Sequence, residues 1–137
     1  MADINIGAIT EALNDKSDRD LRNVNNTTGA DAVIDYQEPT ADNGYTWYRK
    51  YKSGWVEQGG VNTTTNDTTV TISLPIAMFD NNYTVQKTCI TDNSSSLSNI
   101  SFRTFAVSAK TTTSFQTFAN QQSTGGFNWQ VSGKSAQ

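Results

Sequence analysis

Apolar and polar residues alternate with a period of two along most of the chain after residue 30, a pattern typical of β-strands with one buried face. The clearest case is the run 70–76, whose alternate aliphatic residues are predicted to point inward: Val70, Ile72, Leu74 and Ile76. Pro75 cannot donate a ladder hydrogen bond, so this strand is either an edge strand or ends there.

Further strands are predicted from the same period. One ends at Glu38-Pro39, and the others cover 83–91, 100–110 (the longest), part of 111–118, and 127–133, where Phe127, Trp129 and Val131 point inward. Polar turns rich in Asn, Asp and Ser separate them. Short strands at regular spacing predict a mainly β protein with an antiparallel β-sandwich or barrel-like head.

The segment 45–60 reads as an aromatic hairpin, with strands at 45–51 and 55–58 around the turn Lys52-Ser53-Gly54. Gly54 supplies the positive φ of such a turn, and Gly59-Gly60 is expected to end the unit. Alternation places Tyr45, Trp47, Arg49 and Tyr51 on one side and Thr46, Tyr48 and Lys50 on the other. We expect Trp47, Trp55 and Trp129 in the core, because a domain poor in aliphatic residues needs large rings to fill it.

The N-terminal segment has helical spacing, with apolar residues at Ile6, Ile9 and Leu13. This stripe spans too few turns to be stable alone. It either packs on its own domain or forms a parallel oligomeric stem, and isoleucine at the core positions favours trimers over dimers. The polar run 25–31 marks the boundary, which predicts a stem over 1–29 and a head over 30–137.

Composition narrows the function. The chain has 137 residues, a net charge of −3 and no histidine, which argues against nucleic acid as a partner and removes histidine-based catalysis and metal sites. Cys89 is the single cysteine; a buried small residue is favoured over an intermolecular disulfide or a reactive thiol. No signal peptide or membrane-spanning run is visible. We therefore expect synthesis in a cytoplasm, release by another route, no membrane insertion and no cofactor.

A glycan-cleaving enzyme needs two carboxylates at a set separation. Glu57 with Asp80 or Asp92 are candidates, but no spacing selects them, and Glu57 is more simply an ion-pair partner of the adjacent basic strand. We therefore predict a binding protein rather than an enzyme. The candidate binding residues are one surface tyrosine and the asparagines of three polar loops: Tyr48, Asn81, Asn82, Asn93, Asn99 and Asn120.

Four landmarks occur in order along the chain: "NIGAITEALNDKSDRDLRNV", "YTWYRKYKSGWVEQGG", "VTISLPIAMFDNNYTV" and "GFNWQVSG". Together they resemble the C-terminal domain of bacteriophage tail fibre proteins. The resemblance implies a homotrimeric fibre tip in the virion, attached to other tail components, that binds a glycan or protein of the host bacterial surface. It supplies no receptor-binding residues. A structural trimerisation or decoration module without a receptor site is the leading alternative, and a polysaccharide-cleaving enzyme is the third.

Overall fold

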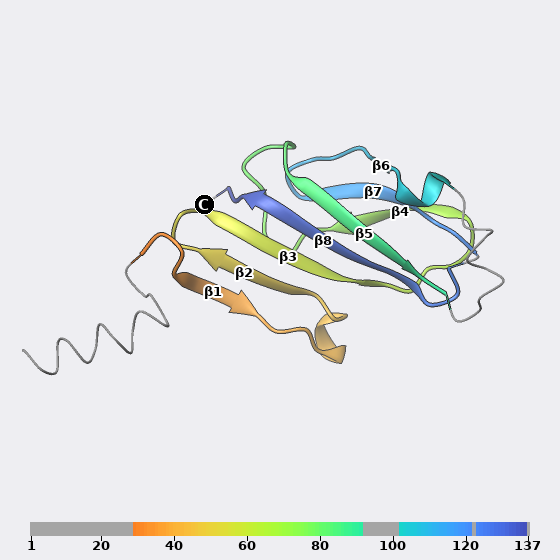
Figure 1. Ribbon diagram of the computed structural model, residues 1–137, viewed down its shortest axis with the longest axis horizontal. Helices are drawn as coiled ribbons and strands as arrows, with labels where there is room; N and C mark the ends of the chain where they lie inside the picture. The colour runs from red at the N-terminus through yellow and green to blue at the C-terminus, as the bar shows by residue number, and fades with distance from the viewer. Residues whose placement is uncertain (1–28, 92–101, 122, 137) are drawn as a thin grey trace, which may run out of the picture.

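The computed structural model describes residues 29–91, 102–121 and 123–136, which form two antiparallel β-sheets (Figure 1). The elements in chain order are β1 (Val33–Gln37), the 3-10 turn η1 (Ala41–Asn43), β2 (Trp47–Tyr51), β3 (Trp55–Asn62), β4 (Thr68–Ser73), β5 (Thr84–Ile90), the 3-10 turn η3 (Phe102–Phe105), β6 (Val107–Ser108), β7 (Ser114–Ala119) and β8 (Gly126–Lys134).

The larger sheet has five strands in the order β1-β2-β3-β8-β5, and the smaller has three in the order β4-β7-β6. Every strand pair is antiparallel. The mainly β, antiparallel fold class predicted from the sequence is therefore confirmed. The predicted stem residues Ile6, Ile9 and Leu13 lie outside the described residues, so the stem and the trimer stay predictions.

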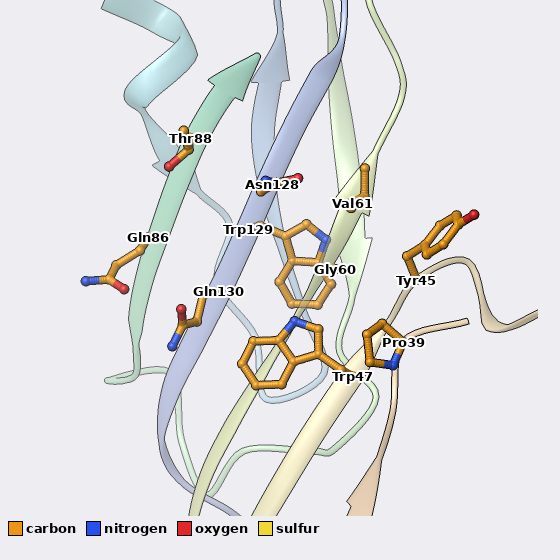
Figure 2. Close-up of a pocket in the computed structure, with 10 residues that line it drawn as sticks. All are labelled: Pro39, Tyr45, Trp47, Gly60, Val61, Gln86, Thr88, Asn128, Trp129 and Gln130. Carbon is orange, nitrogen blue, oxygen red and sulfur yellow. The ribbon is translucent and has the colours of Figure 1, made fainter. Parts of the chain in front are cut away.

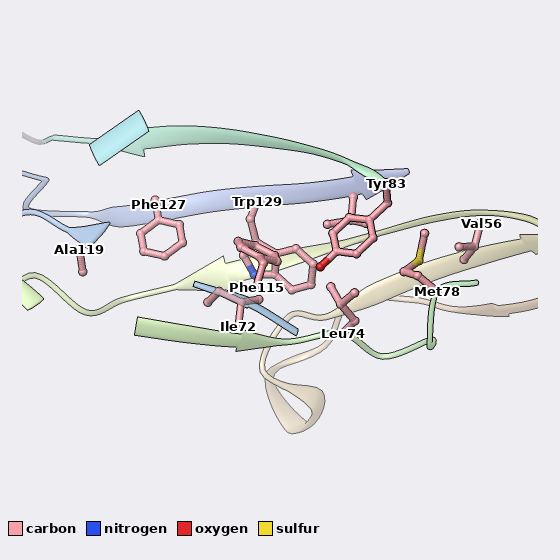
Figure 3. Packing of buried hydrophobic residues seen from close by; sticks show 10 residues of the cluster. Val56, Ile72, Leu74, Met78, Tyr83, Phe115, Ala119, Phe127 and Trp129 are labelled. Atoms are coloured by element: carbon pink, nitrogen blue, oxygen red, sulfur yellow. The ribbon is translucent and has the colours of Figure 1, made fainter. Parts of the chain in front are cut away.

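The core lies between the two sheets (Figure 3). Trp129 of β8 meets Phe115 of β7 edge to face, with ring centroids 5.8 Å apart, and the Tyr83 hydroxyl donates a 2.8 Å hydrogen bond to the carbonyl oxygen of Ser114. The predicted inward faces of 70–76 and 127–133 are confirmed, because their residues belong to this cluster or pack against it: Val70, Ile72, Leu74, Ile76, Phe127, Trp129 and Val131.

Gln58 of β3 is fully buried in this core. Its side-chain amide donates to the carbonyl oxygen of Ile76 at 2.9 Å, and its side-chain oxygen accepts from the backbone N–H of Ile76 at 2.8 Å. The glutamine thus satisfies backbone groups of a segment that lies beyond the end of β4. The inner face of β3 can hold this polar residue because its side chain makes the hydrogen bonds that a neighbouring strand would otherwise make to the Ile76 backbone.

The predicted aromatic hairpin is present as β2 and β3, with Trp47 opposite Gly59 and Gly54 at φ +89°. The expectation that Gly59-Gly60 ends the unit is wrong, because β3 continues to Asn62. A Cβ at Gly59 would lie 2.8 Å from the Trp47 ring, and one at Gly60 would lie 3.0 Å from the Trp129 ring. The two glycines therefore give space to two tryptophans on opposite faces of the sheet.

The strand predicted over 100–110 is wrong in its described part. Residues from Phe102 form the 3-10 turn η3, and β6 that follows is only two residues long. Ala106 closes the turn by donating from its backbone N–H to the carbonyl oxygen of Arg103 at 3.1 Å. A turn with a period near three breaks the inside–outside alternation: Thr104 is fully buried, but Phe105 and Ala106 after it are both exposed.

The strand predicted over 83–91 is confirmed as β5. Its inward side also matches the prediction, since Val85 and Cys89 pack against the core next to Tyr83. Cys89 is a free, half-buried thiol. This position favours the interpretation of Cys89 as a small core residue.

Candidate functional site

The outer face of the five-stranded sheet points away from the core and carries one row of residues across four strands. Trp47 of β2 lies opposite Gly59 of β3, Gly59 opposite Gln130 of β8, and Gln130 opposite Gln86 of β5. Because Gly59 has no side chain, the indole of Trp47 can lie over the backbone of β3. The sheet thereby holds one aromatic ring close to its own surface.

This ring forms part of a groove of about 430 Å³ (Figure 2). Trp47 and the β1–β2 loop supply its aromatic and apolar side, and β5 and β8 supply its polar side. The lining residues are Pro39, Tyr45, Trp47, Gly60, Val61, Gln86, Thr88, Asn128, Trp129 and Gln130.

The polar side of the groove consists of neutral groups. Within the described part of the chain, the side chains of Gln86, Thr88, Asn128 and Gln130 make no hydrogen bond to protein, and no lining residue carries a charge. Amide and hydroxyl groups both donate and accept hydrogen bonds. An aromatic surface beside such groups suits a neutral ligand that has an apolar face and many hydroxyl groups.

The β1–β2 loop holds Tyr45 at the rim of the groove. Tyr45 has a φ of +58° directly after Gly44 at +68°, a conformation that costs free energy in a residue with a side chain. Its backbone N–H donates to the carbonyl oxygen of Thr40 at 2.8 Å. Thr40 and Asn43 bond each other's backbone N–H, and the Asn43 side chain donates to the Glu38 carbonyl oxygen at 2.8 Å. The backbone that carries Tyr45 at the rim is therefore braced by hydrogen bonds within its own loop.

The structure corrects the prediction that three tryptophans fill the core. Trp129 is buried there, but Trp55 has 47% of its surface exposed, and Trp47 is half-buried on the outer face. The inward positions of β3 are instead Val56, Gln58 and Gly60, which are all buried. Trp55 alternates with these residues and therefore points outward.

The predicted receptor residues do not gather at one place. Tyr48 lies on the opposite face of β2 from Trp47, is half-buried, and donates from its hydroxyl to the Asp35 carboxylate at 3.2 Å. Burial, and then the charge of Asp35, raises the pKa of the Tyr48 hydroxyl. Tyr48 therefore lies outside the groove of Trp47.

The predicted asparagines differ in exposure. Asn81 and Asn82 are exposed in the turn before β5, and the Asn82 side chain donates to the Asp80 carboxylate at 3.1 Å. Asn120 is only 4% exposed, so it offers little surface to a receptor. Asn93 and Asn99 lie outside the described residues. A role of the exposed Asn81 and Asn82 in binding stays a prediction.

The candidate catalytic carboxylates are engaged in other contacts. Glu57 accepts a 3.1 Å hydrogen bond from the Tyr51 hydroxyl, whereas Arg49, directly opposite Glu57 in the sheet, forms an ion pair with Glu38 at 3.5 Å. Hydrogen bonds from Asn82 lower the pKa of the Asp80 carboxyl group. The third candidate, Asp92, lies outside the described residues.

The described residues contain no cluster of three or more histidine, cysteine, aspartate or glutamate residues that could hold a metal ion. None of their helices is long and apolar enough to cross a membrane.

The four polar groove residues were not among the binding residues predicted from the sequence: Gln86, Thr88, Asn128 and Gln130. A signal for the last two was present, because they alternate with Phe127, Trp129 and Val131 and must therefore face outward. The same reasoning applies to β5. That β8 adjoins β3 and that β5 adjoins β8, which places these residues beside Trp47, required the structure.

Comparisons with known proteins give one structural similarity. No family model and no curated protein matches the chain. The fold is similar to a C-terminal fragment of the R2 pyocin fibre of P. aeruginosa, with a TM-score of 0.49 and 15% sequence identity over 75% of this chain. The chain spans 27% of the length of that fragment. At this identity the likeness concerns the fold alone.

Proposed function

We propose that this chain is the receptor-binding tip of a bacteriophage tail fibre, and that it binds a glycan of the host bacterial surface. The observation that carries the proposal is the groove of Trp47. It combines an aromatic surface, uncharged amide and hydroxyl groups that have no partner in the described part of the chain, and a rim braced by hydrogen bonds. These are the features of a site for a hydroxyl-rich, uncharged ligand.

The sequence landmarks support the same proposal. Two of them, "YTWYRKYKSGWVEQGG" and "GFNWQVSG", pair as β3 and β8 and meet in the groove. Two of the four segments that resemble tail fibre tips therefore contribute residues to the groove. In this proposal the protein is made in the host cytoplasm, joins the other tail components in the virion and acts outside the cell, without inserting into the membrane or binding nucleic acid.

The proposal includes a homotrimer assembled through Ile6, Ile9 and Leu13. Three copies would present three grooves, and simultaneous binding raises the overall affinity of weak single sites. Ile9→Asp is expected to give monomers in light scattering, because buried charges would meet at the seam. An unchanged oligomer would mean that the head drives assembly.

The groove is tested by adsorption of labelled protein to a panel of bacterial strains, in competition with phage infection. Strain-selective binding that blocks infection is expected, and Trp47→Ala should weaken it at least tenfold, as for a central aromatic contact. Phe105→Ala is the matched control, because Phe105 is an exposed aromatic residue of η3, on the other sheet's side of the molecule. If the protein is trimeric and binds to no strain, the alternative function, a trimerisation or decoration module without a receptor site, would be favoured instead.

Binding without cleavage is the second part of the proposal. A general acid in glycoside hydrolysis needs a raised pKa, whereas the pKa of Asp80 is lowered, and Glu57 is already bonded to Tyr51. Incubation with host polysaccharide is expected to release no reducing sugar. Release that Glu57→Gln or Asp80→Asn abolishes would contradict this and make the protein an enzyme.

A further inference from the structure

A second aromatic site lies on the outer face of the same hairpin. Tyr51 and Trp55 flank the β2–β3 turn and line a slot of about 300 Å³ with Ala30, Asp31 and Ser53. Trp55 has 47% of its surface exposed. The slot is thus an aromatic surface accessible to a ligand and separate from the groove of Trp47.

The slot and the groove face the same direction. Tyr51 reaches Glu57 with its hydroxyl, Trp55 and Glu57 alternate with the buried Val56, and Trp47 lies over Gly59. All of these positions share the outward side of β2 and β3. Trp47 and Tyr51 are four residues apart on β2, as are Trp55 and Gly59 on β3, which corresponds to about 13 Å along the strands.

The surface between the two sites is polar. Arg49 and Glu57 lie opposite each other at the middle of the hairpin, with Arg49 paired to Glu38 and Glu57 bonded to the Tyr51 hydroxyl. β2 and β3 run side by side (Figure 1), and residues of both strands line or border the two sites. A ligand that follows these strands would therefore meet an aromatic ring, a band of hydrogen-bonding groups and then a second pair of rings.

The turn that carries Trp55 is held on both sides. The backbone N–H of Ser53 donates to the Ala30 carbonyl oxygen at 2.9 Å, and the Gly54 carbonyl oxygen accepts from the backbone N–H of Ser135 at 2.7 Å and from its hydroxyl at 2.9 Å. The Ser53 hydroxyl also accepts from the backbone N–H of Trp55 at 3.3 Å. The exposed indole therefore stands on a fixed backbone, which lowers the entropic cost of binding.

We infer that the groove and the slot are two subsites for one extended polysaccharide chain, which lies along the β2–β3 hairpin. This inference rests on the proposed function and specifies its ligand. The receptor is bound within a chain of several sugar residues rather than by a single terminal sugar. Stacked sugar rings occupy Trp47 at one end and the Tyr51–Trp55 slot at the other, and Arg49 and Glu57 bond hydroxyl groups between them.

The test uses surface polysaccharide from a strain to which the protein adsorbs, partly hydrolysed in dilute acid and separated by size. Each fraction is titrated into intact protein by calorimetry. Affinity should rise with chain length until the oligosaccharide spans both sites and then stay constant. Trp55→Ala should not change the affinity for the shortest oligosaccharides. It should remove the gain in affinity, expected to be at least tenfold, that the long ones show. Trp47→Ala should weaken every length, and Phe105→Ala should change none.

The outcomes separate this inference from the proposed function. Affinity that is independent of length, with Trp55→Ala equal to the unmodified protein, would overturn the inference and leave a single site at Trp47. Adsorption to no strain would overturn both. A change of oligomeric state in Trp55→Ala, measured by light scattering, would make the slot a contact between protein chains and would also overturn the inference.

Discussion

Trp47 and Trp129 lie over adjacent glycines of one strand, on opposite faces of one sheet. The inner tryptophan stabilises the fold, whereas the outer one is accessible on the surface. Trp129 fills the space over Gly60 and packs against Phe115 in the core. Trp47 covers Gly59 on the outer face, where amide side chains rather than a second sheet lie beside it. The same residue type thus packs in the core on one face and, in the proposed function, contacts the ligand on the other.

The largest effect should come from removing the inner ring. Trp129→Ala would leave a cavity between the sheets and lower the free energy of unfolding by about 3–5 kcal/mol, measured by urea denaturation. Trp47→Ala should cost far less, because the outer ring is half exposed and leaves no enclosed cavity. Equal losses in the two variants would contradict the assignment of the two faces.

The sequence predicted most of this fold but not the faces of its tryptophans. Alternation correctly placed Ile72 and Val131 inward because the period-two pattern is local. Alternation alone does not say which side is buried, and Trp47 shares its side with Arg49 just as Trp55 shares its side with Glu57. Those charged neighbours were the available signal that both rings face outward.

The groove could not be predicted from a single sequence for a different reason. It needs β8 beside β3 and β5 beside β8, an order that pairs Gly59 with Gln130 and Gln130 with Gln86. These contacts join residues far apart in the chain, so no local pattern encodes them. The wrong strand over 100–110 has a local cause instead, because a 3-10 turn contains the same Thr and Phe residues that favour strands.

Removing the Gln58 side chain should cause the next largest loss of stability, in contrast to removal of the outer glutamines. Gln58→Ala would remove both hydrogen bonds to Ile76 and leave buried backbone groups without a partner, which is expected to cost about 2–3 kcal/mol. Chemical denaturation measures the loss. If Gln58→Ala were as stable as the unmodified protein, the hydrogen bonds between the Gln58 side chain and the Ile76 backbone would not contribute to stability, contrary to this prediction.

The two glycines should separate stability from binding. Gly59→Ala would crowd the Trp47 ring and the backbone carbonyl oxygen of Trp129, and Gly60→Ala would crowd the Trp129 ring. Overpacking of this kind costs about 1–3 kcal/mol. Only Gly59→Ala should displace Trp47 and weaken binding to cells, whereas folded Gly60→Ala should bind normally. Denaturation and adsorption of both variants test this, and equal binding by the two would show that the Trp47 ring does not contact the receptor.

Tyr83 adds a smaller, pH-dependent contribution from the core. Its hydroxyl bonds Ser114, so Tyr83→Phe should cost about 0.5–1.5 kcal/mol. Burial raises its pKa above the ordinary value of 10.0, so the stabilisation is complete below pH 10 and is lost as the pH rises through the folded-state pKa. Subtracting the Tyr83→Phe profile from that of the unmodified protein isolates this loss, because Tyr48, Tyr51 and Lys87 are present in both. A pH-independent difference between the profiles would contradict it.

The smallest effect on stability is expected for the amides of the groove. Gln130→Ala and Gln86→Ala should each change the free energy of unfolding by less than about 0.5 kcal/mol, as at ordinary surface positions. Their side chains make no hydrogen bond to protein in the described part of the chain, so folding gains nothing from them that truncation would remove. Each variant should nevertheless weaken adsorption to cells, since a bound sugar would lose a hydrogen-bonding partner. Gln130 and Gln58 thus form a matched pair from the two faces of the sheet: loss of the inner glutamine should be visible in denaturation, and loss of the outer one only in binding. Normal adsorption by both outer variants would mean that the ligand uses the aromatic side of the groove alone.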